Sequence, residues 1–366
     1  MRVSLGLTGR GVLCALASAT LAMTLPPTAA APAPGEAPRV PFAERYRATL
    51  HGGVARAANS AATCLEPATA AAPSCAAARG GTATGDNGDY EMTYVDVDDD
   101  PNTYNSSRAE LRLPAGARVT HARLYWGGNL RVGEQKDPQD NGRVLLAEEG
   151  GRYKEVLADT VVGHRRTDVM DGYSASADVT HIVAHSGGGT YTVGQLNVAK
   201  GHSAAGAWGG WTLVAAYEHP DEPLRHVVLV DGYEPLHSAR RSVGHTVRNL
   251  PVAPGATGSA GVVAYDGDRG RSGEAMTVRV EGSPAYRVRD AANPADDPFN
   301  STITDHGRPT TGRLPSYPNT LGYDSDVHGV TPAFARGGDS VTFRFTTTRS
   351  EGYQVGALFL QVDARR

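Results

Sequence analysis

Lysine is nearly absent from this sequence, and arginine takes its place. Only three of the 35 basic residues are lysines, which leaves 32 arginines against 39 acidic residues. An arginine-, alanine- and glycine-rich composition of this kind is what a GC-rich genome encodes. Phosphate binding needs clustered lysine and arginine on a basic surface, whereas this chain has a formal net charge of −4. We therefore expect no nucleic acid among its partners.

Long apolar runs are also missing, except at the N-terminus. Residues 1–30 contain Arg2 and Arg10, then an apolar stretch at 12–25, then prolines and small residues up to Ala30. This order predicts a secretory signal peptide that is cleaved after Ala30. No later run approaches the roughly 18 apolar residues that span a bilayer. We expect a mature chain without a transmembrane segment, either secreted or held non-covalently at the cell envelope.

Cysteine is scarce as well, with three in 366 residues. Cys14 lies inside the predicted signal peptide, so Cys64 and Cys75 remain after cleavage. An even number of cysteines in an exported chain predicts one disulfide. The bridge would close a loop of about a dozen residues and stabilise the fold by about 3 kcal/mol.

Sequences suited to long helices are lacking, because 44 glycines and 23 prolines interrupt the chain. From residue 85 onward, segments of five to nine residues recur between Gly, Pro, Asn and Asp clusters. Some alternate, as where Val341, Phe343 and Phe345 are separated by polar residues, and others, such as 211–217, are apolar on both faces. The pattern predicts a mainly β fold, an antiparallel β-sandwich that is jelly-roll-like.

The chain divides into four predicted segments. Residues 1–30 are the signal peptide, and 31–84 form a Pro/Ala-rich leader with the disulfide-restrained stretch. Residues 85–232 form a first β-sandwich. Residues 233–366 form either a second sandwich packed against it or a continuation of one large sandwich, because length alone allows both.

Acidic residues gather in short loops that also carry glycine and asparagine. Calcium takes six to eight oxygen ligands, and such loops between strands can supply them. The candidate calcium ligands are Asp96, Asp98, Asp266, Asp268, Asp324 and Asp326. The alternative interpretation is that Asp and Asn form turns at strand ends without any metal.

Aromatic residues lie beside several of these acidic loops. We select Tyr104, Trp208 and Tyr323 as candidates for stacking on sugar rings of a ligand. Tyrosine accounts for 15 of the 24 aromatic residues, which favours half-exposed positions. The edges of a sandwich use tyrosine in the same way, so this alternative stays open.

A catalytic constellation is not recognisable. His181 and His185 have helical spacing, but Ile182 stands where a zinc protease needs glutamate. Ser203 lacks the strand-to-helix turn of a nucleophile elbow. We therefore favour a non-enzymatic exported protein that binds cell-wall glycan or a surface protein. The alternative is a secreted polysaccharide hydrolase that uses an Asp/Glu pair.

Several motifs together resemble a family of secreted actinobacterial proteins that is classed as a domain of unknown function. The motifs are DY at 89–90, YVDVD at 94–98, NSS at 105–107, ARLYWGG at 122–128, AWGGWTLV at 207–214, VAYDGD at 263–268, FNSTI at 299–303 and NTLGYDSD at 319–326. The likeness covers the chain from about Val40 to its C-terminus. It implies similarity to segments that precede repeat modules in bacterial surface proteins, and it implies no established activity.

Overall fold

Strands dominate the computed structural model, which describes residues 35–349 and 352–364. The predicted signal peptide at 1–30 therefore lies outside the described residues. In the first half the strands are β1 (Glu36–Ala37), β2 (Val40–Ser60), β3 (Ala62–Pro67), β4 (Tyr90–Tyr94), β5 (Ser106–Leu111), β6 (Arg118–Asn129), β7 (Arg143–Glu148), β8 (Lys154–Leu157), β9 (Val162–Arg166), β10 (Asp171–Asp178), β11 (Gly189–Gly194) and β12 (Gly209–Glu218).

The second half continues in the same style. Its strands are β13 (Leu224–Pro235), β14 (Ser242–Val252), β15 (Gly258–Tyr265), β16 (Glu274–Val280), β17 (Tyr286–Arg287), β18 (Ile303–Asp305), β19 (Arg308–Pro309), β20 (Arg313–Leu314), β21 (Tyr323–Gly329), β22 (Gly338–Thr347) and β23 (Gln354–Asp363). The helices are short: α1 (Cys75–Arg79), α2 (Thr180–Ser186) and the 3-10 turns η1 (Asn87–Asp89), η2 (Pro138–Asp140) and η3 (Thr331–Phe334). Within the described ranges, no helix has both the length and the apolar character to cross a membrane.

The strands form one long sheet and three smaller ones. The long sheet has the order β1-β9-β10-β6-β12-β2-β13-β23-β15-β21-β18-β19. A five-stranded sheet, β20-β5-β11-β7-β8, and a four-stranded sheet, β14-β22-β16-β17, lie on its two sides, and β3 pairs with β4. Nearly all pairs are antiparallel, with parallel pairing at β1–β9 and β18–β21. The prediction of a mainly β, antiparallel fold is confirmed, while the jelly-roll assignment stays a prediction.

Strand β2 connects the two halves of the long sheet. Its first part pairs with β13, from Val40 opposite Tyr233 to His51 opposite Leu224. Its second part pairs with β12, beginning at Gly52. Between the two parts, Gly52 has a φ of +153°, and a Cβ there would lie 1.9 Å from the Tyr217 carbonyl oxygen. Only glycine allows the strand to change neighbours at this point.

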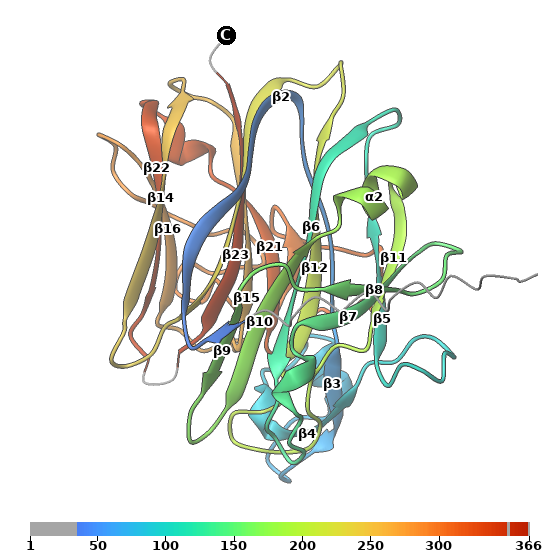
Figure 1. Cartoon of the computed structure of the whole chain (residues 1–366). Helices are drawn as coiled ribbons and strands as arrows, with labels where there is room; N and C mark the ends of the chain where they lie inside the picture. The colour runs from blue at the N-terminus through green and yellow to red at the C-terminus, as the bar shows by residue number, and fades with distance from the viewer. Residues whose placement is uncertain (1–34, 350–351, 365–366) are drawn as a thin grey trace, which may run out of the picture. The chain divides into compact units, whose positions relative to one another are not determined.

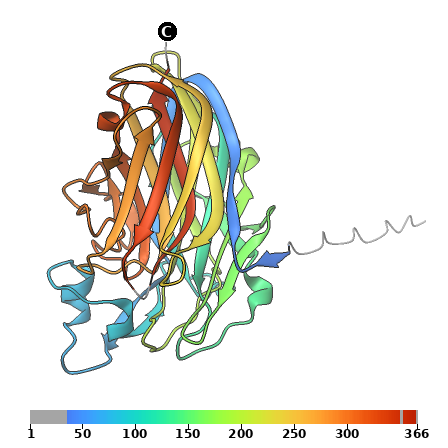
Figure 2. The same ribbon diagram turned by 90° about the vertical axis from the view of Figure 1, so that its left-hand side faces the viewer.

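Three buried clusters make the interior a stack of four layers. One cluster, which includes Trp126 and Leu213, fills the space between the five-stranded sheet and the first half of the long sheet. A second, which includes Met276 and Phe343, lies between the second half and the four-stranded sheet. A third, with Tyr265 at its centre, lies between the two halves of the long sheet. Figure 1 shows the layers side by side, and Figure 2 shows the four-stranded sheet facing the viewer.

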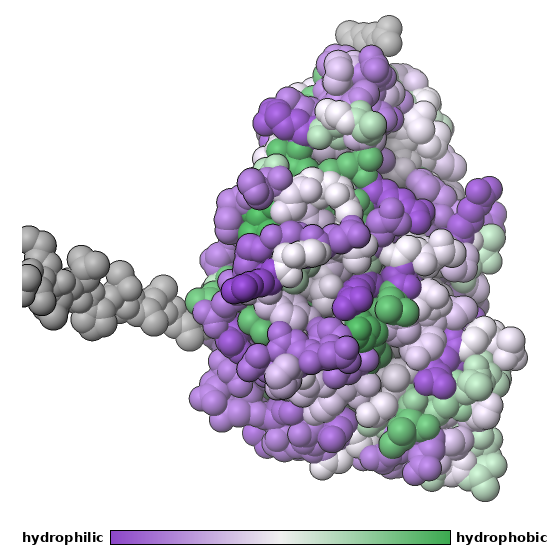
Figure 3. Space-filling model, turned by 90° about the vertical axis from the view of Figure 1, so that its right-hand side faces the viewer, coloured by the Kyte–Doolittle hydropathy of each residue, from purple (hydrophilic) through white to green (hydrophobic). Residues whose placement is uncertain are grey.

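The outer face on the side of the five-stranded sheet is mainly hydrophilic (Figure 3). Large exposed apolar side chains across the described residues are few: Leu65, Leu157, Val161, Val169 and Leu314. Hydrophobic residues appear there as separate spots among polar neighbours. Scattered exposure of this kind is ordinary for a folded surface and indicates no extended apolar interface.

The disulfide and the leader predicted within residues 31–84 fare differently in the structure. The Cys64–Cys75 disulfide is present, as predicted. The structure differs from the predicted leader at 31–84, because residues 40–60 form the central strand β2. That strand is rich in alanine, glycine and arginine, and it borders different layers along its length. Its composition therefore imitates a linker, although it pairs with β13 along its first part and with β12 along its second.

Replacing Gly52 by alanine tests the crossing of β2. The new Cβ would collide with backbone at 1.9 Å, so we expect a loss of about 2–4 kcal/mol in the free energy of unfolding, measured by urea denaturation. Gly150→Ala is the control, since Gly150 also has a positive φ, +70°, but nothing within 4 Å of the added atom. That variant should lose only about 1 kcal/mol. Equal losses in both variants would contradict the steric argument.

Candidate functional site

A cleft of about 430 Å³ opens beside β2, where strands from both halves of the long sheet meet. Its floor comes from β2, β12, β15 and β23, and one wall comes from β5. The opposite wall is the segment 303–314, which connects two sheets: β18 pairs with β21 in the long sheet, and β20 pairs with β5 in the five-stranded sheet. The cleft is thus built from segments that are far apart in the sequence.

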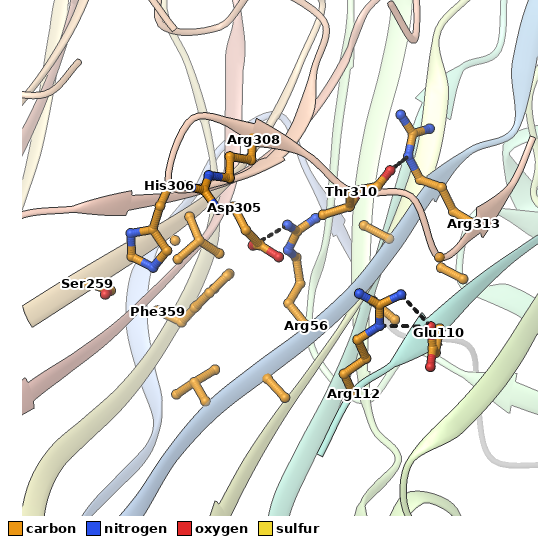
Figure 4. A pocket seen from close by; sticks show the side chains of 18 of the residues that line it. Arg56, Glu110, Arg112, Ser259, Asp305, His306, Arg308, Thr310, Arg313 and Phe359 are labelled. Carbon is orange, nitrogen blue, oxygen red and sulfur yellow. Dashed lines mark hydrogen bonds and ion pairs between the residues drawn. The ribbon is translucent and has the colours of Figure 1, made fainter. Parts of the chain in front are cut away.

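Arginine dominates the charged lining of the cleft. Arg56, Arg112, Arg308 and Arg313 face it, together with the carboxylates of Glu110 and Asp305 (Figure 4). Four guanidinium groups against two carboxylates give a local charge of +2, with His306 taken as neutral. The sign is opposite to that of the whole chain, whose net charge is −4. The cleft is therefore a basic site on an acidic protein.

Two of these arginines are fixed by buried contacts. Arg56, on β2, donates to Asp305 Oδ1 at 2.6 Å and to the Thr304 carbonyl at 3.0 Å. Arg313 is buried and donates to the carbonyls of Thr310 at 3.2 Å and Tyr317 at 2.5 Å. Burial, and then the charge of Arg56, lower the pKa of Arg313 to about 10, so it stays protonated at neutral pH. Both side chains hold the segment 303–314 in place.

The other two arginines lie at the mouth of the cleft. Arg112 donates to Glu110 Oε2 at 2.8 Å, and its side chain is 67 % exposed. The hydrogen bond that Arg112 donates to Glu110 raises the pKa of Arg112. Arg308 is exposed and makes no ion pair with any described residue. Guanidinium groups in this situation can bind a carboxylate or phosphate through two parallel hydrogen bonds.

The three predicted aromatic ligand residues lie away from this cleft. Trp208 and Tyr323 are fully buried, and both rings pack against Tyr265 in the interior cluster between the two halves of the long sheet. Tyr104 is half-buried, with Lys136 Nζ 4.2 Å from its ring centroid. The structure thus brings Trp208 and Tyr323 together in the core, and it leaves Tyr104 elsewhere. Rings on or beside strands that are buried on both faces fill the core, and the sequence pattern cannot tell this from a binding platform.

The predicted calcium ligands of the first half are engaged in local hydrogen bonds. Asp96 accepts from Ser106 Oγ at 2.7 Å. Asp98 accepts from Thr103 Oγ1 and from the Asp100 amide, both at 3.0 Å, and from the Tyr153 hydroxyl. The hydrogen bonds from Tyr153, Asp100 and Thr103 outweigh burial and hold the pKa of Asp98 below its usual range. This bonding is typical of turns at strand ends.

In the second half, the predicted ligands gather at one end of the interior. Asp266, with a φ of +63°, begins the loop after β15. Asp324 and Asp326, on one face of β21, are fully buried. Burial and then the charge of Asp326 raise the pKa of Asp324, and burial raises the pKa of Asp326 to about 6. Asp268 is largely buried, and burial followed by the charge of Asp86 raises its pKa to about 6.

Two further acids belong to this end, and the sequence did not single them out. Glu274 starts β16 and is buried, and Asp297 lies in the loop that faces it. Burial is the largest cause of the raised pKa of each. Across the described ranges, no three Asp, Glu, His or Cys side chains converge closely enough to hold a metal ion by themselves. Any cation here would also need backbone oxygens.

The convergence of the four cleft arginines could not be predicted from the sequence either. Thirty-two arginines are spread along the chain, so no local pattern marks the four that converge. The nearest sign of the cluster is that Arg308 and Arg313 lie close together in the sequence, each at the start of a short strand. Arg56 and Arg112 come from distant strands, and only the fold brings them to the same cavity.

Solved structures of two viral proteins are similar to this chain at low identity. One is the major capsid protein P2 from bacteriophage PM2, with 11% identity, a TM-score of 0.21, and coverage of 85% of this chain and 99% of that chain. The other is titled "Life in the extremes: atomic structure of Sulfolobus Turreted Icosahedral Virus", with 10% identity, a TM-score of 0.22, and coverage of 70% and 86%. Similarity at these TM-scores does not establish a shared fold.

No curated protein matches the sequence. A family model, in contrast, matches residues 79–362, which is most of the chain. The matched range includes β5, the segment 303–314 and the acidic end of the second half, and it begins after β2. The chain belongs to the family described as "Protein of unknown function (DUF3344)".

Proposed function

We propose that this protein is an exported, non-enzymatic binding protein of the cell envelope or extracellular space, and that it binds a negatively charged glycan in the basic cleft. The observation that carries the proposal is the pair Arg112 and Arg308 at the mouth of a cavity of about 430 Å³. Charge-assisted hydrogen bonds from arginine to carboxylate or phosphate are among the strongest that proteins use. A sugar polymer that bears acidic groups supplies such acceptors along its length.

The size of the cleft favours a glycan over a protein partner. Pockets for small ligands measure roughly 300–1,000 Å³, and this cavity falls in that range. A stable protein interface buries about 800 Å² on each partner and usually has an apolar centre. Here the lining carries charged side chains, and its aromatic residues are Phe359 and Tyr217. One or two sugar units with an acidic substituent fit this chemistry better than a protein surface does.

The bonding of the two cleft carboxylates favours binding over hydrolysis. A glycosidase needs one carboxyl group that carries a proton, beside a second that is ionised. Asp305 accepts from Arg56 and Glu110 accepts from Arg112. Each cleft carboxylate is therefore already hydrogen-bonded to a guanidinium group, an arrangement that positions arginine.

Export is inferred from the predicted signal peptide at 1–30 and from the Cys64–Cys75 disulfide. Disulfides persist in oxidising compartments outside the cytosol. The proposal also includes an actinobacterial source. It includes, too, the similarity to segments that precede repeat modules in bacterial surface proteins. Attachment to the envelope would then come from the glycan itself, through the cleft.

A binding experiment with matched oligosaccharides tests the cleft. We expect an oligogalacturonate hexamer to bind with an affinity that falls as salt rises, and neutral maltohexaose to bind at least tenfold more weakly. The double variant Arg112→Ala/Arg308→Ala should weaken hexamer binding about 100-fold or more, since hydrogen bonds to charged groups contribute about 1.5–3 kcal/mol each. Isothermal titration calorimetry gives each affinity.

Arg279→Ala is the control, because Arg279 is exposed on β16 in the four-stranded sheet, away from the cleft. It should leave hexamer binding unchanged. Equal affinity for the acidic and the neutral oligosaccharide would contradict the proposed ligand class. Unchanged affinity in the double variant would show that the ligand binds elsewhere.

A hydrolysis assay separates the two function classes. Incubation of the protein with the hexamer should release no reducing ends above the rate of the buffer alone, because both cleft carboxylates are paired with arginine. The colorimetric assay for reducing sugars measures this directly. Release that disappears in Glu110→Gln or Asp305→Asn would instead establish the hydrolase.

A further inference from the structure

A histidine on β9, His164, lies between two carboxylates that come from different strands. Its Nδ1 is 2.6 Å from Glu36 Oε2 on β1, and its Nε2 is 2.6 Å from Asp171 Oδ1 at the start of β10. An ionised carboxylate can only accept, so each contact requires a hydrogen on the ring nitrogen. A neutral imidazole has one such hydrogen and the imidazolium has two. The arrangement is therefore complete only when His164 is protonated.

Strand β1 is held at the end of the long sheet mainly by polar contacts. It is two residues long, it pairs in parallel with the first two residues of β9, and its side chains are exposed or half-buried. The Val162 amide donates to the Gly35 carbonyl at 3.0 Å, and Asn141 Nδ2 donates to Glu36 Oε1 at 3.1 Å. Among the ion pairs of the described residues, the pair with His164 is the one that includes β1.

The groups around His164 make its proton the deciding charge. Arg166, two residues further along β9, has its Nε 3.9 Å from Asp171 Oδ2 and is 66 % exposed. Gln135 Nε2 donates to the same oxygen at 3.3 Å and is neutral. Tyr173 lies opposite His164 on β10, and burial raises its pKa well above the usual range, so it is neutral too. Two carboxylates therefore face two positive groups when His164 is protonated, and one when it is not.

The two carboxylates stabilise the charged form of His164. Burial disfavours a charged ring, but the hydrogen bonds to Asp171 and Glu36 outweigh burial and raise the pKa of His164 above its ordinary value of 6.5. The stabilisation is then fully present below the ordinary value and is lost as pH rises through the raised one. The Asp171 side chain is 2 % exposed and that of Glu36 is 36 % exposed. The contact with Glu36 is the one that opens, because water can solvate this carboxylate.

A second ion pair, directly after β1, keeps its charge over the same pH range. Arg39 donates to both carboxylate oxygens of Glu234, at 2.7 and 3.0 Å. The hydrogen bond to Glu234 raises the pKa of Arg39, so the guanidinium group stays protonated. Pro38 lies between this pair and β1. Loss of the contact between His164 and Glu36 therefore frees the chain up to Pro38 and leaves β2 in place.

We propose that β1 and His164 form a pH-controlled latch: protonated His164 holds Glu36 and keeps β1 paired with β9, and loss of that proton releases β1. Release leaves the outer edge of β9 unpaired at Val162 and Gly163. Unpaired backbone groups at the edge of a sheet are a template on which another strand can pair. The latch therefore determines whether this end of the long sheet is covered, and it acts independently of any ligand in the cleft.

Hydrogen exchange at the Val162 amide tests the latch, because this amide donates to Gly35 only while β1 is paired. Its protection factor is the exchange rate of an unstructured chain divided by the observed rate at the same pH. We expect this factor to fall about tenfold between about pH 6 and about pH 9, on the two sides of the histidine titration. Amides of the central strand β12 should stay protected at both pH values. Pulsed deuterium labelling with mass spectrometry and fragmentation gives each factor.

Glu36→Gln separates the latch from a general effect of pH. The new amide group can donate to the ring nitrogen that has lost its hydrogen, so Val162 should stay protected at about pH 9. His164→Gln does not titrate, so its protection factor at Val162 should be the same at both pH values. His181→Gln is the matched control, because His181 is exposed on α2, and it should show the fall of the wild type.

A wild-type protection factor at Val162 that is equal at both pH values would overturn the proposal. A fall of wild-type size in Glu36→Gln would overturn it too, because a group other than this ion pair would then control β1. Should His164→Gln fail to fold, Glu36→Gln decides alone, since its side chain lies on the exposed end of the sheet.

Discussion

The pairing of one strand with two different neighbours is the constraint on which the rest of the structure depends. Strand β2 pairs first with β13 and then with β12, and it changes partner at Gly52. Because hydrogen bonding is continuous across this point, the two halves share one long sheet. The inner faces of those halves then pack on each other and bury a third cluster of side chains. Without β2, each half would expose an apolar sheet face to water.

The cleft is a consequence of the same crossing. Where β2 passes between the halves, Arg56 on it reaches toward the segment 303–314 and bonds to Asp305. The same segment also joins the five-stranded sheet, because its strand β20 pairs with β5. Strands β2, β5, β18 and β20 therefore meet around one cavity. The exposed side chains of the mouth, Arg112 and Arg308, extend from the elements that these pairings hold together.

Strands that have one dry and one wet face could be predicted from the sequence. Alternation marked Val341, Phe343 and Phe345, which lie inside β22. Strand β2 could not be recognised, because its faces border different layers along its length and its alanines and glycines resemble a linker. The burial of Trp208 and Tyr323 was hidden for a related reason: Trp208 directly precedes β12 and Tyr323 begins β21, and strands with two dry faces give no sign of which aromatic is exposed. The four arginines of the cleft converge only through the fold.

The two charged regions solve the problem of buried like charge in different ways. In the cleft, the guanidinium groups of Arg56 and Arg313 are neutralised or solvated by one carboxylate and several backbone carbonyls. A cation can use carbonyl oxygens as substitutes for water, and strand ends supply them in abundance. A buried carboxylate needs donors instead. At the acidic end the amides of Gly273 and Glu274 donate to the Asp296 carbonyl, and Asp324 accepts from the Thr302 amide while its second oxygen has no partner among the described residues. Burial, followed by the charge of Asp326, therefore raises the pKa of Asp324.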